Sequence, residues 1–262
     1  MRILQEQFDL TDFFARVEAA SERLLLLDYD GTLAPFQVRR DRAVIYPDVE
    51  AALTQLIAAD HTRIVIVSGR ALADLRPLLT LDPLPELWGT HGFERLTPDG
   101  RVMQLPLPAE IRQRLEQAHA LLANTRLRRR LELKPASVAV HWRGCTAAEI
   151  GRIRTLIAEH WGPLVADERL RISEFDGGQE LRVVGIDKGR AVRTLIAEHP
   201  QAAIAYLGDD LTDEDAFRAL RGHGLGVLVH VNYRPTAAEL WIKPRTELAR
   251  FLRRWEEAAT HR

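Results

Sequence analysis

Short aliphatic runs alternate with helical repeats of apolar residues along the first part of the chain. Residues 24–27 and 64–67 are entirely aliphatic, a pattern typical of strands that are buried on both faces of a parallel sheet. Apolar residues at helical spacing follow each run, and they predict a helix that begins at Pro47 and another over residues 71–79. A third strand is expected to end near Trp88. This alternation predicts an α/β fold.

A different pattern occupies residues 106–184. It begins after two prolines with an amphipathic stretch, and its last two strands flank a turn that contains two glycines. The expected elements are a helix over residues 110–124, a strand over 138–142, a helix from the capping box at Thr146 to about residue 160, and strands over 170–174 and 180–184. These features predict a smaller α+β domain inserted into the α/β fold.

Strand and helix patterns alternate again after residue 185. The expected elements are a helix from residue 188, a strand over 203–207, a helix from about 213, a strand over 226–229, a second capping box at 236–239 and a terminal helix over 245–259. We therefore predict a doubly wound, Rossmann-like parallel-sheet core over residues 1–105 and 185–262. A smaller α+β cap domain, residues 106–184, is inserted into it.

Composition narrows the classes of function. The 262 residues carry 36 basic and 37 acidic side chains, and this balance argues against a nucleic-acid partner. The polar N-terminus lacks the apolar core of a signal peptide, no apolar stretch is long enough to span a bilayer, and the single cysteine excludes a disulfide framework. We expect a soluble, cytoplasmic protein without a membrane partner. The lack of a long apolar stripe or a coiled-coil heptad predicts a monomer.

Two carboxylates follow the first aliphatic run. Asp28 and Asp30 stand where the strand ends, and ligands of open α/β sheets bind beyond the carboxyl ends of the strands. Gly31 allows a tight backbone whose amides can meet an anion. The string indicates an active-site loop, with an ordinary Asp-Gly turn as the alternative.

Two further elements are suited to binding a phosphate. Ser68, Gly69 and Arg70 follow the second aliphatic run, where a hydroxyl and a glycine amide can bond a phosphate oxygen; the alternative is a serine that caps the next helix. Lys188 begins a helix, where the helix dipole disfavours a cation. This placement indicates that Lys188 neutralises a phosphate or clustered carboxylates, with a solvated surface lysine as the alternative.

The densest acidic string, residues 208–214, follows another predicted strand. Its acids would repel one another without a cation, and hard oxygen ligands of this kind suit Mg²⁺. Acids that favour the first turn of a helix are an alternative for Asp213 and Glu214, and a weaker one for Asp209. Taken together, the four elements could neutralise a phosphate while one carboxylate attacks it.

These four elements, in this order, resemble the motifs of the haloacid dehalogenase superfamily of phosphohydrolases. The resemblance implies that Asp28 is the nucleophile that forms a phosphoaspartyl intermediate and that Asp30 is the general acid/base. It also implies that Ser68 and Lys188 hold the phosphate. Mg²⁺ would be bound by the carboxylates of Asp28 and Asp209 and by the main-chain carbonyl of Asp30, with Asp213 close behind them.

Other strings resemble the trehalose-6-phosphate phosphatase family within this superfamily. Residues 89–94 are similar to its Gly-x-His-Gly-x-Glu string, residues 208–214 to its Gly-Asp-Asp-x-Thr-Asp-Glu string, and residues 132–134 and 137–143 to its cap segment. The resemblance extends from about residue 24 to 255 and implies Mg²⁺-dependent hydrolysis of trehalose 6-phosphate. The substrate-binding residues that it implies are Gly69, Arg70, His91, Gly92, Glu94, Glu132, Lys134, Arg143 and Glu180.

Several alternatives stay open at this point. The substrate could instead be the phosphate of sucrose, mannosylglycerate or glucosylglycerol, because hydrolysis of these phosphates would need the same catalytic residues. A signalling receiver also clusters acids and a lysine around an aspartate, but receivers are shorter and would leave Asp30 without a role. A non-catalytic regulatory subunit of trehalose synthesis would be expected to lack one of the acids, and all are present. The charged cap residues could form an ordinary ion-pair network instead of a sugar site, and His91 could have a structural role instead of binding substrate. Association with a trehalose-6-phosphate synthase is also open.

Overall fold

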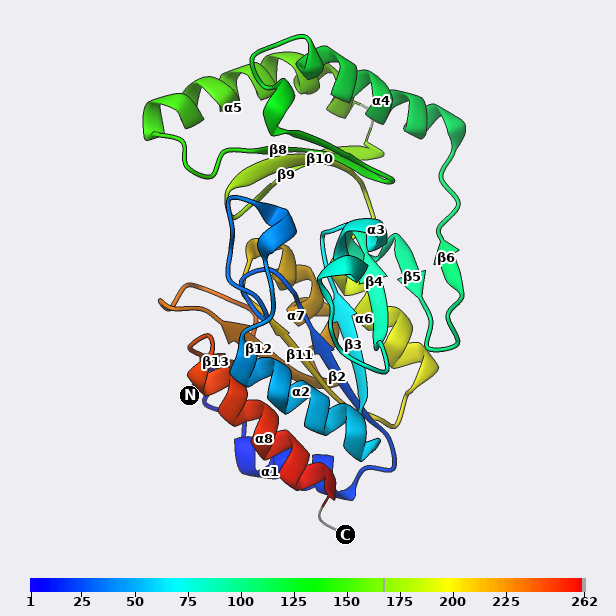
Figure 1. Cartoon of the computed structure of the whole chain (residues 1–262), viewed down its shortest axis with the longest axis vertical. Coiled ribbons are helices and arrows are strands. Elements are labelled where there is room, and N and C mark those ends of the chain that lie inside the picture. Colours follow the sequence, from blue (N-terminus) through cyan, green and yellow to red (C-terminus); the bar gives the residue numbers. More distant parts are fainter. Residues whose placement is uncertain (167, 261–262) are drawn as a thin grey trace. The chain divides into compact units, whose positions relative to one another are not determined.

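The computed structural model describes residues 1–166 and 168–260 (Figure 1). Contacts between Cα atoms divide the chain into two compact units, one of Met1–Met103 with Lys188–Arg262 and the other of Gln104–Asp187. The sequence placed these two junctions after residues 105 and 184. We call the first unit the core and the second the cap, and each is described separately.

A mostly parallel sheet forms the centre of the core. In the described part of the chain it has nine strands in the order β1-β13-β12-β11-β2-β3-β4-β5-β6. Their bounds are β1 Arg2–Ile3, β2 Arg23–Leu27, β3 Arg63–Val67, β4 Glu86–Gly89, β5 Glu94–Leu96, β6 Val102–Gln104, β11 Ala203–Gly208, β12 Gly224–Val229 and β13 Leu240–Ile242. The strands from β13 to β4 are parallel to their neighbours, and β1 and β5 pair antiparallel at the two sides. This confirms the predicted doubly wound fold.

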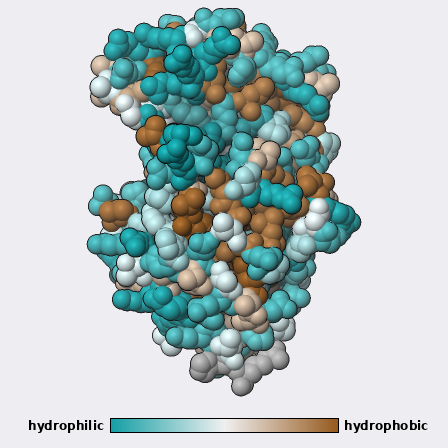
Figure 2. Space-filling view, in the orientation of Figure 1, coloured by the Kyte–Doolittle hydropathy of each residue, from teal (hydrophilic) through white to brown (hydrophobic). Residues whose placement is uncertain are grey.

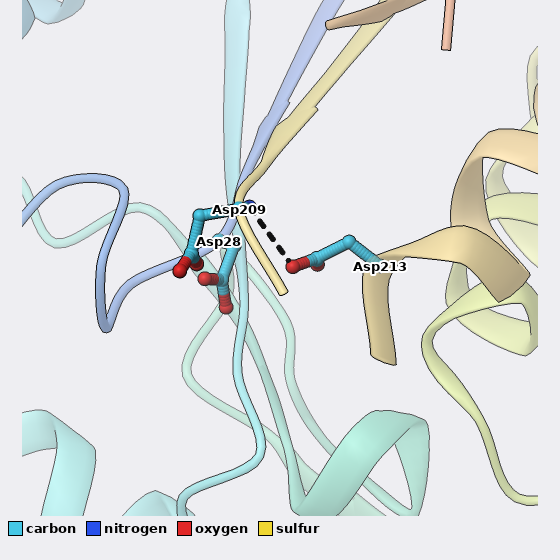
Figure 3. Close-up of side chains that lie close together, drawn as sticks. All are labelled: Asp28, Asp209 and Asp213. Atoms are coloured by element: carbon cyan, nitrogen blue, oxygen red, sulfur yellow. Dashed lines mark hydrogen bonds between the residues drawn. The ribbon is translucent and has the colours of Figure 1, made fainter. Parts of the chain in front are cut away.

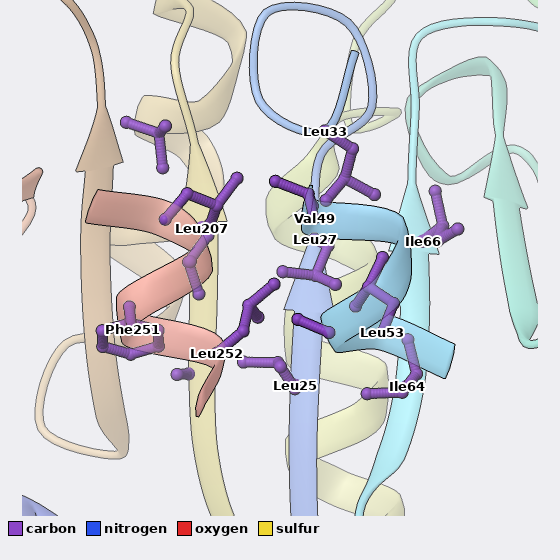
Figure 4. Close-up of a cluster of buried hydrophobic side chains, with 14 of the residues drawn as sticks. Leu25, Leu27, Leu33, Val49, Leu53, Ile64, Ile66, Leu207, Phe251 and Leu252 are labelled. Atoms are coloured by element: carbon purple, nitrogen blue, oxygen red, sulfur yellow. The ribbon is translucent and has the colours of Figure 1, made fainter. Parts of the chain in front are cut away.

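Helices cover both faces of the core sheet. Leu25 and Leu27 of β2 pack in one apolar cluster with α2 (Pro47–Ala59) and α8 (Thr246–Thr260), as Figure 4 shows, and α1 (Leu10–Ala19) joins the same cluster. Leu24 and Leu26 point to the opposite face, where α6 (Lys188–Glu198) and α7 (Glu214–Leu220) pack. Because successive side chains of a strand alternate between faces, the four consecutive leucines of β2 bury both faces of the strand.

The cap is a four-stranded antiparallel sheet with helices on one face. Its strand order is β7-β8-β10-β9, with bounds β7 Leu131–Lys134, β8 Ser137–His141, β9 Leu170–Phe175 and β10 Gly178–Val183 in the described residues. Helices α4 (Ala109–Ala123) and α5 (Ala147–Trp161) bury their apolar stripes against Val138, Val140 and Leu181. The predicted α+β layout is therefore confirmed, and the other face of this sheet carries polar side chains.

Two of the predicted elements were wrong. The helix expected over residues 71–79 is only one turn long, α3 (Leu72–Leu75), followed by a 3₁₀ turn that contains Pro77. The capping box expected at residues 236–239 starts no helix in the described structure. The Glu239 carboxylate instead accepts from the amide of Gly226 at 2.8 Å, and the next three residues form β13 beside β12.

The surface in the view of Figure 2 is largely hydrophilic, with patches of apolar side chains. Large apolar side chains that are more than half exposed include Val38, Val44 and Val231, all in loops. Among the described residues, no helix combines the length and the apolar character that crossing a membrane requires. The monomer and the cytoplasmic location remain predictions.

Candidate active site

The parallel pairing of β2 with β11 brings two acids together. Leu27 lies opposite Leu207 in the register, and the amide of Asp28 donates to the Leu207 carbonyl at 2.8 Å. Asp28 therefore follows β2 directly beside the end of β11, where Asp209 begins the acidic loop (Figure 3). Both side chains are buried. Neighbouring parallel strands thus assemble two motifs that lie far apart in the sequence.

Lys188 links Asp28 to the other end of the acidic loop. Its ammonium donates to Oδ1 of Asp28 at 2.6 Å and to Oδ1 of Asp213 at 2.7 Å. Burial alone would lower the pKa of Lys188, but the carboxylates of Asp213 and Asp28 raise it above its usual value, so the side chain is charged. Lys188 is therefore a buried charge partner and not a solvated surface lysine.

Asp213 is held by protein donors on both oxygens. Besides Lys188, the hydroxyl of Tyr206 donates to Oδ1 at 2.5 Å. The amides of Asp209 and Asp210 donate to Oδ2 at 3.1 and 2.9 Å. Asp213 thus shapes the loop and holds Lys188. Tyr206 was not identified from the sequence, although a tyrosine inside an aliphatic strand just before the acidic loop could have marked it.

The acidic cluster has the chemistry of a cation site. Asp28, Asp209 and Asp213 each offer a carboxylate oxygen, and these oxygens lie within 4.8 Å of one another. Burial and the neighbouring charges of Asp28, Asp213 and Asp210 raise the pKa of Asp209 well above its usual value. Burial likewise raises the pKa of Asp28, although Lys188 opposes it. The ammonium of Lys188 contacts Asp28 and Asp213, so these three buried carboxylates carry more negative charge than Lys188 neutralises, and a set of oxygen ligands alone fits Mg²⁺.

Gly31 is required where the loop after β2 passes the cluster. Its φ of +89° is rarely adopted by residues with a side chain, and an added Cβ would collide with the carboxylate of Asp209. The glycine predicted for a tight turn therefore also makes room for Asp209.

Arg70 lies against Asp30. Its Nε and NH2 groups donate to the two carboxylate oxygens of Asp30, both at 2.6 Å, in a bidentate pair. Ser68 is buried, and its hydroxyl accepts from the amide of Arg70 at 3.1 Å, while the N-cap of α3 is Ala71. The alternative of a helix-capping serine is therefore wrong. Arg70 fixes the direction of the Asp30 carboxylate, and its expected contact with substrate remains a prediction.

The turn after β4 places His91 against the Ser68 loop. Thr90, His91 and Gly92 all have positive φ, and a Cβ on Gly69 would lie 2.6 Å from Cε1 of His91. Glu94 stabilises this unusual backbone, because its Oε2 accepts from the Thr90 hydroxyl at 2.8 Å and from the amide of Leu72 at 3.1 Å. His91, Gly92 and Gly69 thus come together, and the contacts of Glu94 point to a positioning role within the turn.

The cap sheet gathers several of its predicted residues on its polar face. Oε1 of Glu180 accepts from Lys134 at 2.8 Å and from the hydroxyl of Ser137 at 2.7 Å. Glu132 lies 3.9 Å from the ammonium of Lys134 and 2.7 Å from Nε2 of His141. Ser137 and His141 were not among the predicted site residues, although both lie within the string that resembles the cap segment.

Arg143 follows β8 and contacts the turn between β9 and β10. Its NH2 group donates to the carbonyl of Asp176 at 2.5 Å and to the carboxylate of the same residue at 3.0 Å. Its side chain also covers Gly177. Arg143 was expected beside Glu132, Lys134 and Glu180, and a role in reading the sugar remains a prediction.

Comparison with known proteins decides the family. The sequence model of the trehalose-phosphatase family matches residues 26–240, which include the four core elements and the whole cap. The chain belongs to the trehalose-phosphatase family. It is 34% identical over 248 residues to a trehalose-phosphate phosphatase of Mycobacterium marinum, an alignment that covers 87% of this chain and 60% of the relative. The chain thus spans about 60% of the length of that relative.

Solved structures support the fold of this trehalose-phosphatase family member. The C-terminal domain of a C. albicans trehalose-6-phosphate phosphatase matches with a TM-score of 0.78 at 19% identity, covering 99% of both chains. A haloacid dehalogenase-like hydrolase from B. subtilis matches with a TM-score of 0.60 at 17% identity, covering 88% of this chain and 99% of that one. The core and cap therefore have the fold of haloacid dehalogenase-like hydrolases.

Proposed function

We propose that this protein hydrolyses trehalose 6-phosphate to trehalose and inorganic phosphate, with Mg²⁺ as cofactor. The observation that carries the proposal is the buried pairing of Asp28 with Lys188 beside Asp209 and Asp213, in a chain of the trehalose-phosphatase family. A carboxylate held at a strand end with a cation partner is suited to nucleophilic attack on a phosphate.

In the first step, a carboxylate oxygen of Asp28 attacks the phosphorus. A bond forms between that oxygen and phosphorus, and the bond from phosphorus to the sugar oxygen breaks. Asp30 gives its proton to the departing sugar oxygen, so that the free sugar leaves as a neutral alcohol. The two hydrogen bonds from Arg70 hold Asp30 in one orientation when it is ionised, so protonation of one Asp30 oxygen for this transfer releases the bond that Arg70 makes to that oxygen.

In the second step, water attacks the phosphorus of the aspartyl phosphate. Asp30, now ionised, takes the proton of the water, and the bond between phosphorus and the Asp28 oxygen breaks to release phosphate. Lys188 and the Ser68 hydroxyl stabilise charge on the phosphate oxygens in both steps. Mg²⁺, held by Asp28, Asp209 and the main-chain carbonyl of Asp30, would supply further charge neutralisation.

The decisive experiment is release of inorganic phosphate from a panel of sugar phosphates, with and without Mg²⁺. The panel holds trehalose 6-phosphate, sucrose 6-phosphate, glucose 6-phosphate and mannosylglycerate phosphate at equal concentration. We expect Mg²⁺-dependent release from trehalose 6-phosphate alone. Release from another member would keep the phosphatase and replace the sugar, and release from none would favour a regulatory protein.

The Glu180→Ala variant tests whether the cap cluster reads the sugar. It removes the shared partner of Lys134 and Ser137, so we expect kcat/KM for trehalose 6-phosphate to fall roughly 10- to 100-fold. Hydrolysis of p-nitrophenyl phosphate, which offers no sugar hydroxyls, should change little.

The matched control for this variant is Glu174→Ala, which removes an exposed glutamate from the neighbouring strand β9. It should leave both substrates unaffected. Equal losses of Glu180→Ala on the two substrates would mean that Glu180 acts through folding and not through recognition of the sugar.

A further inference from the structure

Arg234 lies against the acidic loop, although it comes from the segment between β12 and β13. Its NH2 group donates to the main-chain carbonyls of Asp209 at 3.0 Å and of Asp210 at 2.8 Å, and its Nε donates to the Asp209 carbonyl at 3.3 Å. The NH1 group donates to the Glu214 carboxylate at 2.5 Å and to the Pro235 carbonyl at 3.1 Å. Every nitrogen of the guanidinium is thus engaged.

These contacts fix the backbone that carries Asp209. A planar guanidinium that bonds two consecutive carbonyls sets the orientation of both peptide planes. The amides of Asp209 and Asp210 are already held by Oδ2 of Asp213. The loop is therefore bound from its amide side by Asp213 and from its carbonyl side by Arg234, and the direction of the Asp209 side chain is set between them.

Glu214 anchors Arg234 to the start of α7. One carboxylate oxygen accepts from Arg234, and the other accepts from the amide of Ala237 at 2.8 Å. The side chain of Glu214 is 12% exposed and that of Arg234 is 18% exposed, so water competes weakly for these bonds. The last acid of the string therefore pairs with an arginine, whereas Asp28, Asp209 and Asp213 form the candidate cation site.

We propose that Arg234 is a positioning residue for the cation site, one that holds the acidic loop so that Asp209 can bind Mg²⁺. The inference rests on the proposed function, since it assumes the same metal. Charge alone predicts the opposite effect, because a guanidinium near a bound cation repels it. If geometry outweighs repulsion, loss of Arg234 weakens Mg²⁺ binding; if repulsion dominates, loss of Arg234 strengthens it.

Two variants separate geometry from charge. Arg234→Met removes both the charge and the planar group, whereas Arg234→Lys keeps the charge and loses the geometry that bonds two carbonyls and a carboxylate at once. We expect the dissociation constant for Mg²⁺, measured by isothermal titration calorimetry, to rise about tenfold or more in both. The Mg²⁺ concentration that half-saturates phosphate release should rise in parallel, and kcat should recover at high Mg²⁺.

Arg218→Met is the matched control. Arg218 lies on α7 and pairs with Asp215 at 2.7 Å, so its loss removes one positive charge near the loop without touching Asp209 or Asp210. We expect its Mg²⁺ affinity to stay within about twofold of the wild type.

The outcomes are distinguishable. Unchanged or tighter Mg²⁺ binding by Arg234→Lys, in a wild type that binds Mg²⁺ and releases phosphate, would overturn the inference and leave the proposed function intact. A wild type that binds no Mg²⁺ would overturn both. If Arg234→Met does not fold, Arg234→Lys decides alone, because it retains the charge beside Glu214.

Discussion

The Asp28→Asn variant should fold and lose phosphate release by about 10⁴-fold or more. The amide has the same shape as the carboxylate, and its oxygen can still accept from Lys188, which donates to Oδ1 at 2.6 Å in the wild type. The neutral amide is a far weaker nucleophile and forms no stable bond to phosphorus. It also removes one negative charge from the cation site, so Mg²⁺ binding should weaken as well.

The measurement is phosphate release from trehalose 6-phosphate at saturating Mg²⁺, together with the thermal unfolding midpoint. Asp60→Asn is the matched control, because Asp60 is an exposed acid at the end of α2 with φ +52°, a conformation that asparagine tolerates. The control should retain full turnover. Wild-type release by Asp28→Asn would refute the assignment of Asp28 as nucleophile.

Most residues of the core site could be predicted from the sequence because they directly follow the ends of strands. The aliphatic runs before Asp28 and Ser68 predicted β2 and β3, and parallel strands meet at one edge of the sheet. The register of β2 with β11 then brings Asp28 beside Asp209, as alternation of strands and helices implies. The motifs that follow β2, β3 and β11 therefore needed only the strand before them to be placed, whereas Lys188 was placed by the helix that it begins.

The supporting residues could not be found in this way, because their partners lie elsewhere in the chain. Arg234 donates to the main-chain carbonyls of Asp209 and Asp210, which precede it by 25 and 24 positions. No periodic pattern in a sequence links a loop arginine to main-chain oxygens. The resemblance implied that Arg70 binds substrate, but it did not predict the bonds from its guanidinium to the carboxylate of Asp30, which lies on another loop 40 residues earlier. Tertiary contacts of this kind require the fold itself.

The predictions for short elements were wrong for a different reason. β13 has three residues, and its pairing with β12 outweighs the capping box that precedes it. The helix after Ser68 ends after one turn because Pro77 interrupts the periodic pattern. The local sequence pattern determines the secondary structure of long, strongly patterned segments, whereas packing and pairing with neighbouring elements determine that of short ones.

The second large effect concerns Asp209, whose replacement by asparagine should stabilise the protein without metal and abolish its response to Mg²⁺. Burial and three neighbouring acids raise the pKa of Asp209 in the folded state well above the ordinary aspartate value of about 3.9 that applies when the chain is unfolded. Between these two pKa values the folded state binds more protons than the unfolded state, so the free energy of unfolding falls as pH rises. Asparagine removes this dependence, and the metal-free variant should be more stable than the wild type above about pH 4.

The test is thermal unfolding at pH 7 in a chelator and in excess Mg²⁺. In the chelator we expect the unfolding midpoint of Asp209→Asn to exceed that of the wild type by about 2–4 °C for each kcal/mol gained. In Mg²⁺ at about a hundred times its dissociation constant, the free energy of unfolding of the wild type should rise by roughly 2.7 kcal/mol and that of the variant by almost nothing. The difference between the two unfolding midpoints should therefore shrink or change sign.

A variant that is less stable than the wild type in the chelator would show that the carboxylate supports the fold. The reversal would instead show that the acids of this site oppose folding until a cation joins them, as expected where a chain keeps buried like charges for catalysis and not for stability.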